Sequence, residues 1–151
     1  YAPEAPAALA FGRPGLRKTY VVDRASVIVA WQCRGLAGRR LTTRLNLAMP
    51  SCDGFLGRYV LADGSIPGGF GQPLEVNQAT WLTLEDGVLG GRLDLQTSFS
   101  AQIAGQPQQT VSQSEAGFEK IMQAAEVSFT WTIPADDCTL QLQLTIASSA
   151  P

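Results

Sequence analysis

Apolar and polar residues alternate one by one through long parts of this sequence, and this period of two limits the fold more than any other feature. Neighbouring side chains of a β-strand point to opposite faces of a sheet, so such a pattern gives one apolar and one polar face. Residues 41–49 place Leu41, Leu45 and Met49 on one face and Arg44 on the other, and residues 92–103 repeat the pattern. Both segments are predicted to be half-buried strands.

Two more alternating runs lie near the C-terminus, separated by the turn-forming residues 134–137. The inward positions would be Val127, Phe129, Trp131 and Ile133 in the first run and Cys138, Leu140, Leu142, Leu144 and Ile146 in the second. A four-residue loop would pair Ile133 with Cys138 and Trp131 with Leu140 on one face. The two runs therefore predict an antiparallel hairpin with a shared apolar side.

The remaining pattern predicts an all-β fold: a mostly antiparallel β-sandwich or partly open barrel with one short α-helix. Further strands are expected at residues 19–23, 26–33, 57–62 and 74–84, the last with a break near its middle. The helix is expected within residues 112–125, because Ser112 and Glu115 have capping-box spacing and Phe118, Ile121 and Met122 follow at helical spacing. With 151 residues, the chain fits one domain over residues 1–151, with an extended Ala/Pro-rich segment at residues 1–14.

The N-terminal composition and the cysteines predict an extracytoplasmic protein, either periplasmic or at the cell surface. The first ten residues resemble the exposed segment that follows a removed signal peptide, and a lipid anchor upstream of Tyr1 is a further option. A disulfide between Cys33 and Cys52 is preferred, because it would join neighbouring predicted strands and leave Cys138 free. The alternative is three reduced thiols in a cytosolic protein. No apolar run is long enough to span a membrane.

The sequence contains no histidine, which excludes Ser-His-Asp and Cys-His hydrolases and sites where histidine binds zinc or copper. The cysteines lack paired C-x-x-C spacing and the Gly-rich residues 68–71 lack the P-loop frame, so no metal or cofactor is predicted. Glu85, Asp86 and Asp94 cluster across a predicted turn and are the best candidates for the two carboxyl groups of a glycosidase. The same residues are common in turns, so no catalytic residue is assigned and the chain is predicted not to be an enzyme.

Four arginines are the main candidate binding residues: Arg34, Arg39, Arg40 and Arg44. Gly35 and Gly38 predict a loop from which guanidinium groups could meet a carboxylate, a phosphate or an acidic polysaccharide. The opposing interpretation is pairing within the chain, because residues 1–60 hold nine basic and three acidic residues whereas residues 61–151 hold two basic and ten acidic ones. A pI of about 5.0 argues against nucleic acid as a partner.

Phe70 is the fifth candidate binding residue, since it lies in the irregular, Gly-rich segment 63–73. An exposed aromatic ring there would contact a sugar or a protein surface. The opposing interpretation is an ordinary loop in which the Phe70 ring belongs to the core.

Together these features predict an exported, non-enzymatic binding module of a bacterial cell envelope or surface, used for adhesion or assembly through a protein or glycan partner. Two alternatives stay open. One is a periplasmic inhibitor or immunity protein that blocks a partner enzyme's cleft with the loop at residues 63–73 or 103–113. The other is a carboxylate-based carbohydrate-active enzyme.

Overall fold

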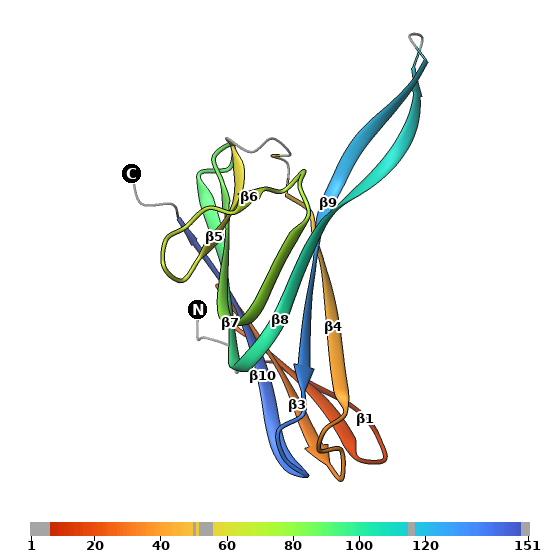
Figure 1. The fold of residues 1–151 in the computed structure, drawn as a ribbon, viewed down its shortest axis with the longest axis vertical. Coiled ribbons are helices and arrows are strands. Elements are labelled where there is room, and N and C mark those ends of the chain that lie inside the picture. The colour runs from red at the N-terminus through yellow and green to blue at the C-terminus, as the bar shows by residue number, and fades with distance from the viewer. Residues whose placement is uncertain (1–6, 50, 52–55, 115–116, 149–151) are drawn as a thin grey trace.

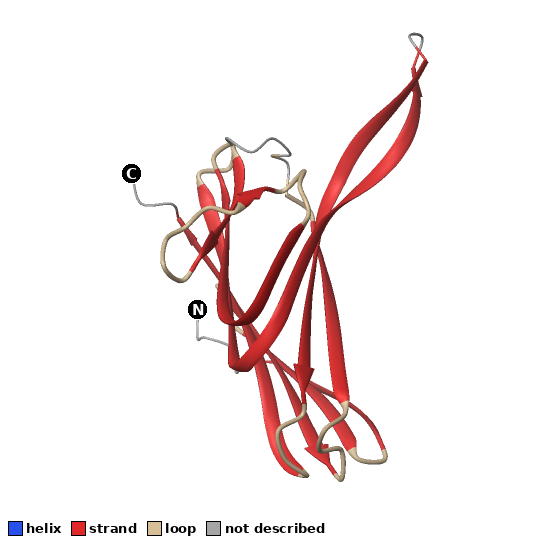
Figure 2. Cartoon of the chain, viewed as in Figure 1, coloured by secondary structure: helices blue, strands red, loops and turns tan. Residues whose placement is uncertain are grey.

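Figure 1 shows the chain as a computed structural model, which describes residues 7–49, 51, 56–114 and 117–148. The regular elements of these residues are strands, all paired antiparallel (Figure 2). They are β1 (Ala7–Arg13), β2 (Leu16–Val22), β3 (Ser26–Arg34), β4 (Arg40–Leu47), β5 (Gly57–Leu61), β6 (Gly68–Gly69), β7 (Leu74–Asp86), β8 (Gly91–Ser114), β9 (Gly117–Thr132) and β10 (Asp137–Ser148).

The strands form one sheet that folds into two layers. The first layer runs β1-β2-β3-β10 and reaches the beginning of β8, and the second runs from the later part of β8 through β9 to β4. β7 and β8 belong to both layers: residues 81–86 pair with 91–96 in the first, and residues 74–79 pair with 101–105 in the second. The pairing is irregular between these two parts, which is where both strands pass from one layer to the other.

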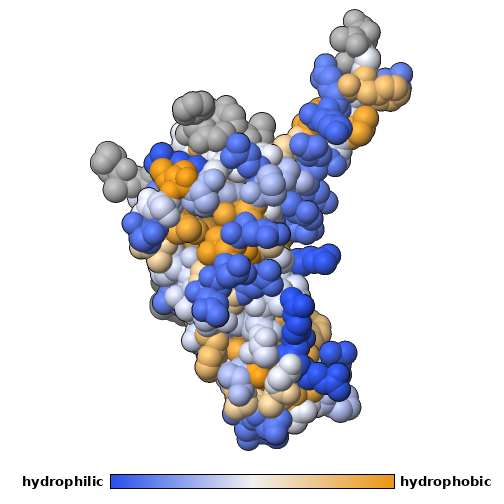
Figure 3. All heavy atoms as spheres, viewed as in Figure 1, coloured by the Kyte–Doolittle hydropathy of each residue, from blue (hydrophilic) through white to orange (hydrophobic). Residues whose placement is uncertain are grey.

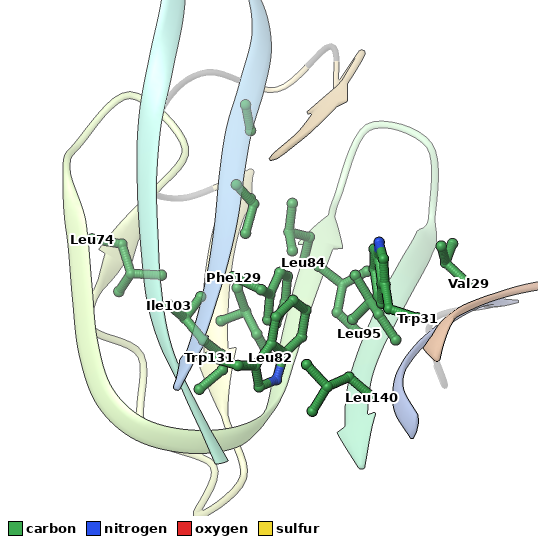
Figure 4. Packing of buried hydrophobic residues seen from close by; sticks show 14 of the residues in the cluster. Val29, Trp31, Leu74, Leu82, Leu84, Leu95, Ile103, Phe129, Trp131 and Leu140 are labelled. Carbon is green, nitrogen blue, oxygen red and sulfur yellow. The ribbon is translucent and has the colours of Figure 1, made fainter. Parts of the chain in front are cut away.

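The core lies between the layers (Figure 4). Trp31 of β3 meets Trp131 of β9 with ring centroids 5.3 Å apart, and Phe129 stacks on Trp131 at 6.0 Å. Leu74 and Ile103 lie toward one end of this cluster and Val29 toward the other, as Figure 4 shows. The apolar sides of the alternating strands therefore meet each other, as a sandwich or a partly open barrel requires.

β8 and β9 extend beyond the body as a two-stranded arm, called the β8–β9 arm here (Figure 1). It comprises the paired residues 108–114 and 117–124, and a bulge after Gln108 adds one residue to β9. The bulge shifts the alternation of β9 by one, so Phe118 and Met122 stay on the core-facing side together with Val111. Phe118 is 78% exposed and Val111 is 66% exposed. Figure 3 accordingly shows hydrophobic patches on a mostly hydrophilic arm.

The all-β prediction is confirmed, but the predicted short α-helix is wrong. The segment at residues 112–125 forms the end of β8 and the first part of β9, and no helix occurs among the described residues. Its helical spacing has a different origin: Met122 and Phe118 lie on one side of the arm, and Ile121 lies on the other. Pairing with β8 satisfies the backbone groups that a helix would have bonded internally. No element of the described residues is a helix able to cross a membrane.

The predicted C-terminal hairpin is also wrong. β9 pairs with β4 and β8, whereas β10 pairs with β3 and β8. Trp131 and Leu140 are both buried, as their alternation predicts, but they belong to opposite layers. The turn at residues 134–136 takes the chain across the sandwich instead of back along the same layer.

Candidate functional site

An open groove of about 760 Å³ lies on the outer face of the second layer. Its polar lining comes from four strands: Arg40 of β4, Asn77 and Gln78 of β7, Ser100 and Gln102 of β8, and Thr130 and Thr132 of β9. Gln102 and Thr130 are direct cross-strand partners, and their neighbours Ile103 and Phe129 are buried in the core. Alternation therefore turns the groove residues outward. Ligand sites commonly measure about 300–1,000 Å³.

A β-bulge in β7 forms one wall of this groove. Val76 pairs with Ile103 and Ala79 pairs with Ala101, so Asn77 and Gln78 together oppose the single residue Gln102. Gln78 has a φ of 55°, the left-handed region that side chains other than glycine rarely adopt. Neither its side chain nor that of Asn77 makes a hydrogen bond within the described part of the chain. Both amides are exposed and face solvent without a partner there.

The corner of β8 that forms the base of the groove is held by Trp131 from the core. The indole Nε1–H of Trp131 donates to Thr97 Oγ1 at 2.8 Å and to the carbonyl oxygen of Phe99 at 3.2 Å. Thr97 Oγ1 also donates to the same carbonyl at 3.1 Å. Ser100 follows directly, so a buried hydrogen-bond set fixes the backbone where the groove begins.

The groove offers donors and acceptors but little charge. Its amide side chains both donate and accept hydrogen bonds, its hydroxyl groups do the same, and Arg40 adds guanidinium donors. Thr130 Oγ1 shares a hydrogen bond of 2.9 Å with Thr42 Oγ1, which orients one hydroxyl at the groove. Arg40 is the single charged residue of the lining as described. Such a set suits a ligand with many hydroxyl groups rather than a strongly charged one.

The predicted carboxylate cluster has structural roles. Glu85 accepts a 2.7 Å bond from Arg58 Nε, and Asp94 accepts one of 2.7 Å from Thr83 Oγ1. Asp86 is buried and accepts bonds from Ser51 Oγ at 2.7 Å and from two turn amides at 2.9 and 3.0 Å. These interactions connect neighbouring strands and close the β7–β8 turn. The three residues therefore do not form a pair of free carboxyl groups.

The pKa of Asp86 is lowered, which agrees with this structural role. Burial acts to raise the pKa, but the hydrogen bonds from Ser51 and from the amides of Leu89 and Val88 outweigh it. The carboxylate is thus held ionised, whereas a glycosidase acid needs a raised pKa.

The four predicted arginines do not meet at one site. Arg40 lines the groove, while Arg34 lines a separate depression of about 230 Å³ with Arg13 and Arg17. Arg34 also lies 3.7 Å from Asp137, and both side chains are more than 80% exposed, so this ion pair is weak. Arg39 is exposed in the loop before β4, and Arg44 shares the outer face of β4 with Arg40. Anion binding by these arginines stays a prediction.

Phe70 does not lie on the surface. Its ring is fully buried and meets Tyr59 edge to face, with centroids 5.2 Å apart. The packing needs Gly57, because a Cβ there would lie 2.5 Å from the Phe70 ring. Phe70 is therefore a core residue, as the second interpretation of this loop held, and it cannot contact a ligand at this position.

The disulfide between Cys33 and Cys52 stays a prediction, because Cys52 lies outside the described residues. Cys33 is buried and sits directly opposite Cys138 in the β3–β10 pairing. Burial and the neighbouring Cys138 thiol raise the pKa of Cys33, so this thiol is a poor nucleophile. The described residues contain no cluster of acidic and cysteine side chains that could hold a metal ion.

Sequence analysis missed the groove apart from Arg40. Gln and Thr on the polar face of a strand are ordinary residues, and the sequence does not show which strands lie side by side. The one available signal was the expected break in the middle of residues 74–84, which the bulge at Asn77 and Gln78 explains.

Comparison with known proteins connects this fold to carbohydrate chemistry. Residues 6–146 match the family model described as alpha-amylase/4-alpha-glucanotransferase, C-terminal. The 4-alpha-glucanotransferase from Thermococcus litoralis has a similar structure, with 15% identity and a TM-score of 0.59 over 96% of this chain and 21% of that one. The Slr1438 protein from Synechocystis sp. PCC 6803 is similar over 93% of this chain and 60% of that one, with 11% identity and a TM-score of 0.51. No match was found among curated proteins.

These comparisons correct two predictions. The non-enzymatic module for adhesion or assembly is wrong, because the matching family consists of domains from carbohydrate-active enzymes. The prediction that the chain is not an enzyme is corrected for the same reason, because the family model describes the C-terminal part of alpha-amylases and 4-alpha-glucanotransferases. At such low identities the two solved structures show the fold alone, and this chain spans about a fifth of the glucanotransferase and three fifths of the Synechocystis protein.

Proposed function

The chain belongs to the alpha-amylase/4-alpha-glucanotransferase C-terminal family, and we propose that it serves as the C-terminal domain of an enzyme that hydrolyses α-glucans or transfers parts of them. The observation that carries this proposal is the extent of the family match, which covers residues 6–146 and so includes both layers, the groove and the β8–β9 arm.

The domain has a supporting role in this enzyme. Cleavage of a glycosidic bond needs two carboxyl groups on opposite sides of the bond. Glu85, Asp86 and Asp94 are engaged in ion pairs and hydrogen bonds that hold strands and turns together. The groove, in turn, contains no carboxylate in its described lining. The carboxyl groups that cleave the substrate therefore come from another part of the enzyme.

An activity assay on two proteins tests this function. The first is the complete product of the gene that encodes the chain, and the second is residues 1–151 alone. Each is incubated with maltoheptaose, and the products are separated by chromatography. Shorter maltooligosaccharides indicate hydrolysis, and a mixture of shorter and longer ones indicates transfer. We expect the complete product to give one of these patterns and residues 1–151 to give neither.

Two results would contradict the proposal. Failure of the complete product to convert maltoheptaose, soluble starch or glycogen would remove the α-glucan assignment. Turnover by residues 1–151 would place the catalytic groups within this domain, and the Glu85→Gln, Asp86→Asn and Asp94→Asn variants would then identify them.

A further inference from the structure

We propose that the outer groove between the β7 bulge and strands β8, β9 and β4 binds a segment of an α-glucan chain, and that Gln78 is held in its left-handed conformation for this contact. The inference rests on the proposed function for its choice of ligand. It adds a binding site on a domain that carries no cleavage chemistry of its own.

The lining of the groove matches the surface of a sugar chain. Each ring of an α-glucan presents hydroxyl groups that both donate and accept hydrogen bonds, and the amides of Asn77, Gln78 and Gln102 do the same from three adjacent positions. Thr130, whose hydroxyl group is oriented by Thr42, lies opposite Gln102. Arg40 contributes donors without needing an anionic partner.

The polar surface continues past the groove along the same face of the layer. Arg44 pairs with Ser128, and Asn46 pairs with Glu126, on the outward side of β4 and β9. Gln106 of β8 donates to Glu126 at 2.9 Å in the same row. Polar rows therefore extend the site toward the arm, so several linked sugar residues have groups to contact along the strands.

Gln78 points to a ligand because glutamine is an unusual residue at a left-handed position of a bulge. A left-handed conformation is energetically unfavourable for residues other than glycine, and such residues persist mainly at functional positions. Glycine would fit the bulge without this strain. The Gln78 side chain makes no hydrogen bond within the described residues and is exposed, so no hydrogen bond of this side chain supports the folded state there.

Two other ligand classes fit the groove less well. A phosphate or sulfate group would need several cations, and Arg40 is the one cation in the described lining. A protein partner would need an apolar centre, whereas the apolar member of the lining, Ala101, is 3% exposed. A neutral, hydroxyl-rich polymer remains as the class that satisfies the groove.

The test measures binding and stability on the same variants. Calorimetric titration of the protein with maltoheptaose gives the affinity, and thermal unfolding gives the midpoint temperature. Gln78→Gly is expected to weaken binding by about 3- to 10-fold through the loss of a hydrogen-bonding side chain. It is also expected to leave the midpoint temperature unchanged or raise it, because the left-handed strain is relieved. A residue with only a structural role would not combine these two effects.

Two further variants make the result specific. Arg40→Ala should weaken binding by a similar factor, whereas Arg17→Ala, an exposed arginine on β2 away from the groove, should leave the affinity unchanged. Cellohexaose, which has the same sugar rings in β linkage, should bind more weakly than maltoheptaose.

The outcomes separate this site from the proposed function. If maltoheptaose binds equally well to the parent, Gln78→Gly and Arg40→Ala, the groove is not the site, while the enzyme assignment stands. If the parent does not bind maltoheptaose although the complete gene product converts it, the groove is again rejected as a binding site, and the enzyme assignment stands. Absence of both binding and conversion would reject both. Equal affinity for cellohexaose would reject the preference for α-glucan.

Discussion

Trp131 offers the sharpest test of the two-layer core. Its ring is 1% exposed, lies between Trp31 and Phe129, and donates from Nε1 to Thr97 and to the carbonyl of Phe99. Replacement by alanine removes the contact between Trp31 and Trp131 and opens a cavity in the core. A buried tryptophan replaced by alanine typically costs about 3–5 kcal/mol of unfolding free energy.

The contacts of Trp131 indicate that the cost of Trp131→Ala in unfolding free energy lies in the middle of that range or above. Two aromatic neighbours lose their partner, and each aromatic pair contributes about 0.5–1.5 kcal/mol beyond simple burial. The carbonyl of Phe99, however, keeps its bond from Thr97 Oγ1, and the Thr97 hydroxyl keeps a partner as a donor. We therefore expect a loss of about 4 kcal/mol, or a fall of about 8–16 °C in the midpoint temperature, since 1 kcal/mol corresponds to about 2–4 °C at this size.

Trp131→Phe separates packing from hydrogen bonding. It keeps an aromatic ring beside Trp31 but removes the Nε1–H donor, so we expect a smaller loss of about 1–2 kcal/mol. Phe118→Ala is the control, because Phe118 is 78% exposed and should change stability by less than about 0.5 kcal/mol. Urea unfolding followed by circular dichroism measures all three. A loss below about 2 kcal/mol for Trp131→Ala would refute the two-layer core.

Three further predictions follow from buried groups and from the arm. Tyr59→Phe should raise stability by about 1 kcal/mol in urea unfolding, because the buried Tyr59 hydroxyl has no partner among the described residues. Burial raises the pKa of Tyr59 to about 12, above its usual value near 10. The folded state should therefore lose stability as the pH rises from about 10 to 12. Tyr59→Phe should remove this loss. Asp86→Asn should cost about 1–3 kcal/mol of unfolding free energy at neutral pH. Because the native pKa of Asp86 is lowered, the stability that this carboxylate contributes is present above about pH 4 and is lost as the pH falls through the native pKa. The unfolding curves of the parent and the variant should therefore converge in acid. In hydrogen exchange by mass spectrometry, the β8–β9 arm should exchange faster than the body strands, since a two-stranded ribbon is only marginally stable in water; equal protection would mean that another surface covers the arm.

The strands and their buried faces could be predicted from the sequence. The strand predicted at residues 41–49 is confirmed over residues 41–47, which belong to β4 and alternate in burial, and Val127, Phe129 and Trp131 are buried as their spacing predicts. This succeeds because alternation is a local property: each strand in a half-buried sheet must show one apolar side wherever its partners lie.

The spacing of apolar residues gave a wrong prediction where two different structures produce the same spacing. The segment at residues 112–125 fits a helix by its apolar spacing, but a bulge in a two-stranded arm produces the same spacing. The run containing Trp131 and the run containing Leu140 fit a hairpin, but they face each other across the core with equal burial. In the second case the side chains are placed correctly on the inner side, and the pairing partner is not.

The groove, too, could be predicted from the sequence only in part. Arg40 was a candidate because of its charge, and the break in residues 74–84 was visible as an interruption of the alternation. Gln78 carried no signal of its own, because a left-handed glutamine has the same letter as an extended one. The groove exists only because the bulge of β7 is placed beside β8, β9 and β4.

The sequence by itself determined that this protein is built from strands, which side chains point inward, and that no histidine chemistry is available. Only the tertiary structure decided which strands pair, that β7 and β8 pass through both layers, and that Arg40 and Gln78 line one groove. The physical reason is the distance along the sequence over which each feature is decided. The direction of a side chain depends on its neighbours along the chain, whereas strand pairing depends on contacts between residues far apart, for which many partners offer similar hydrogen bonds and similar apolar faces.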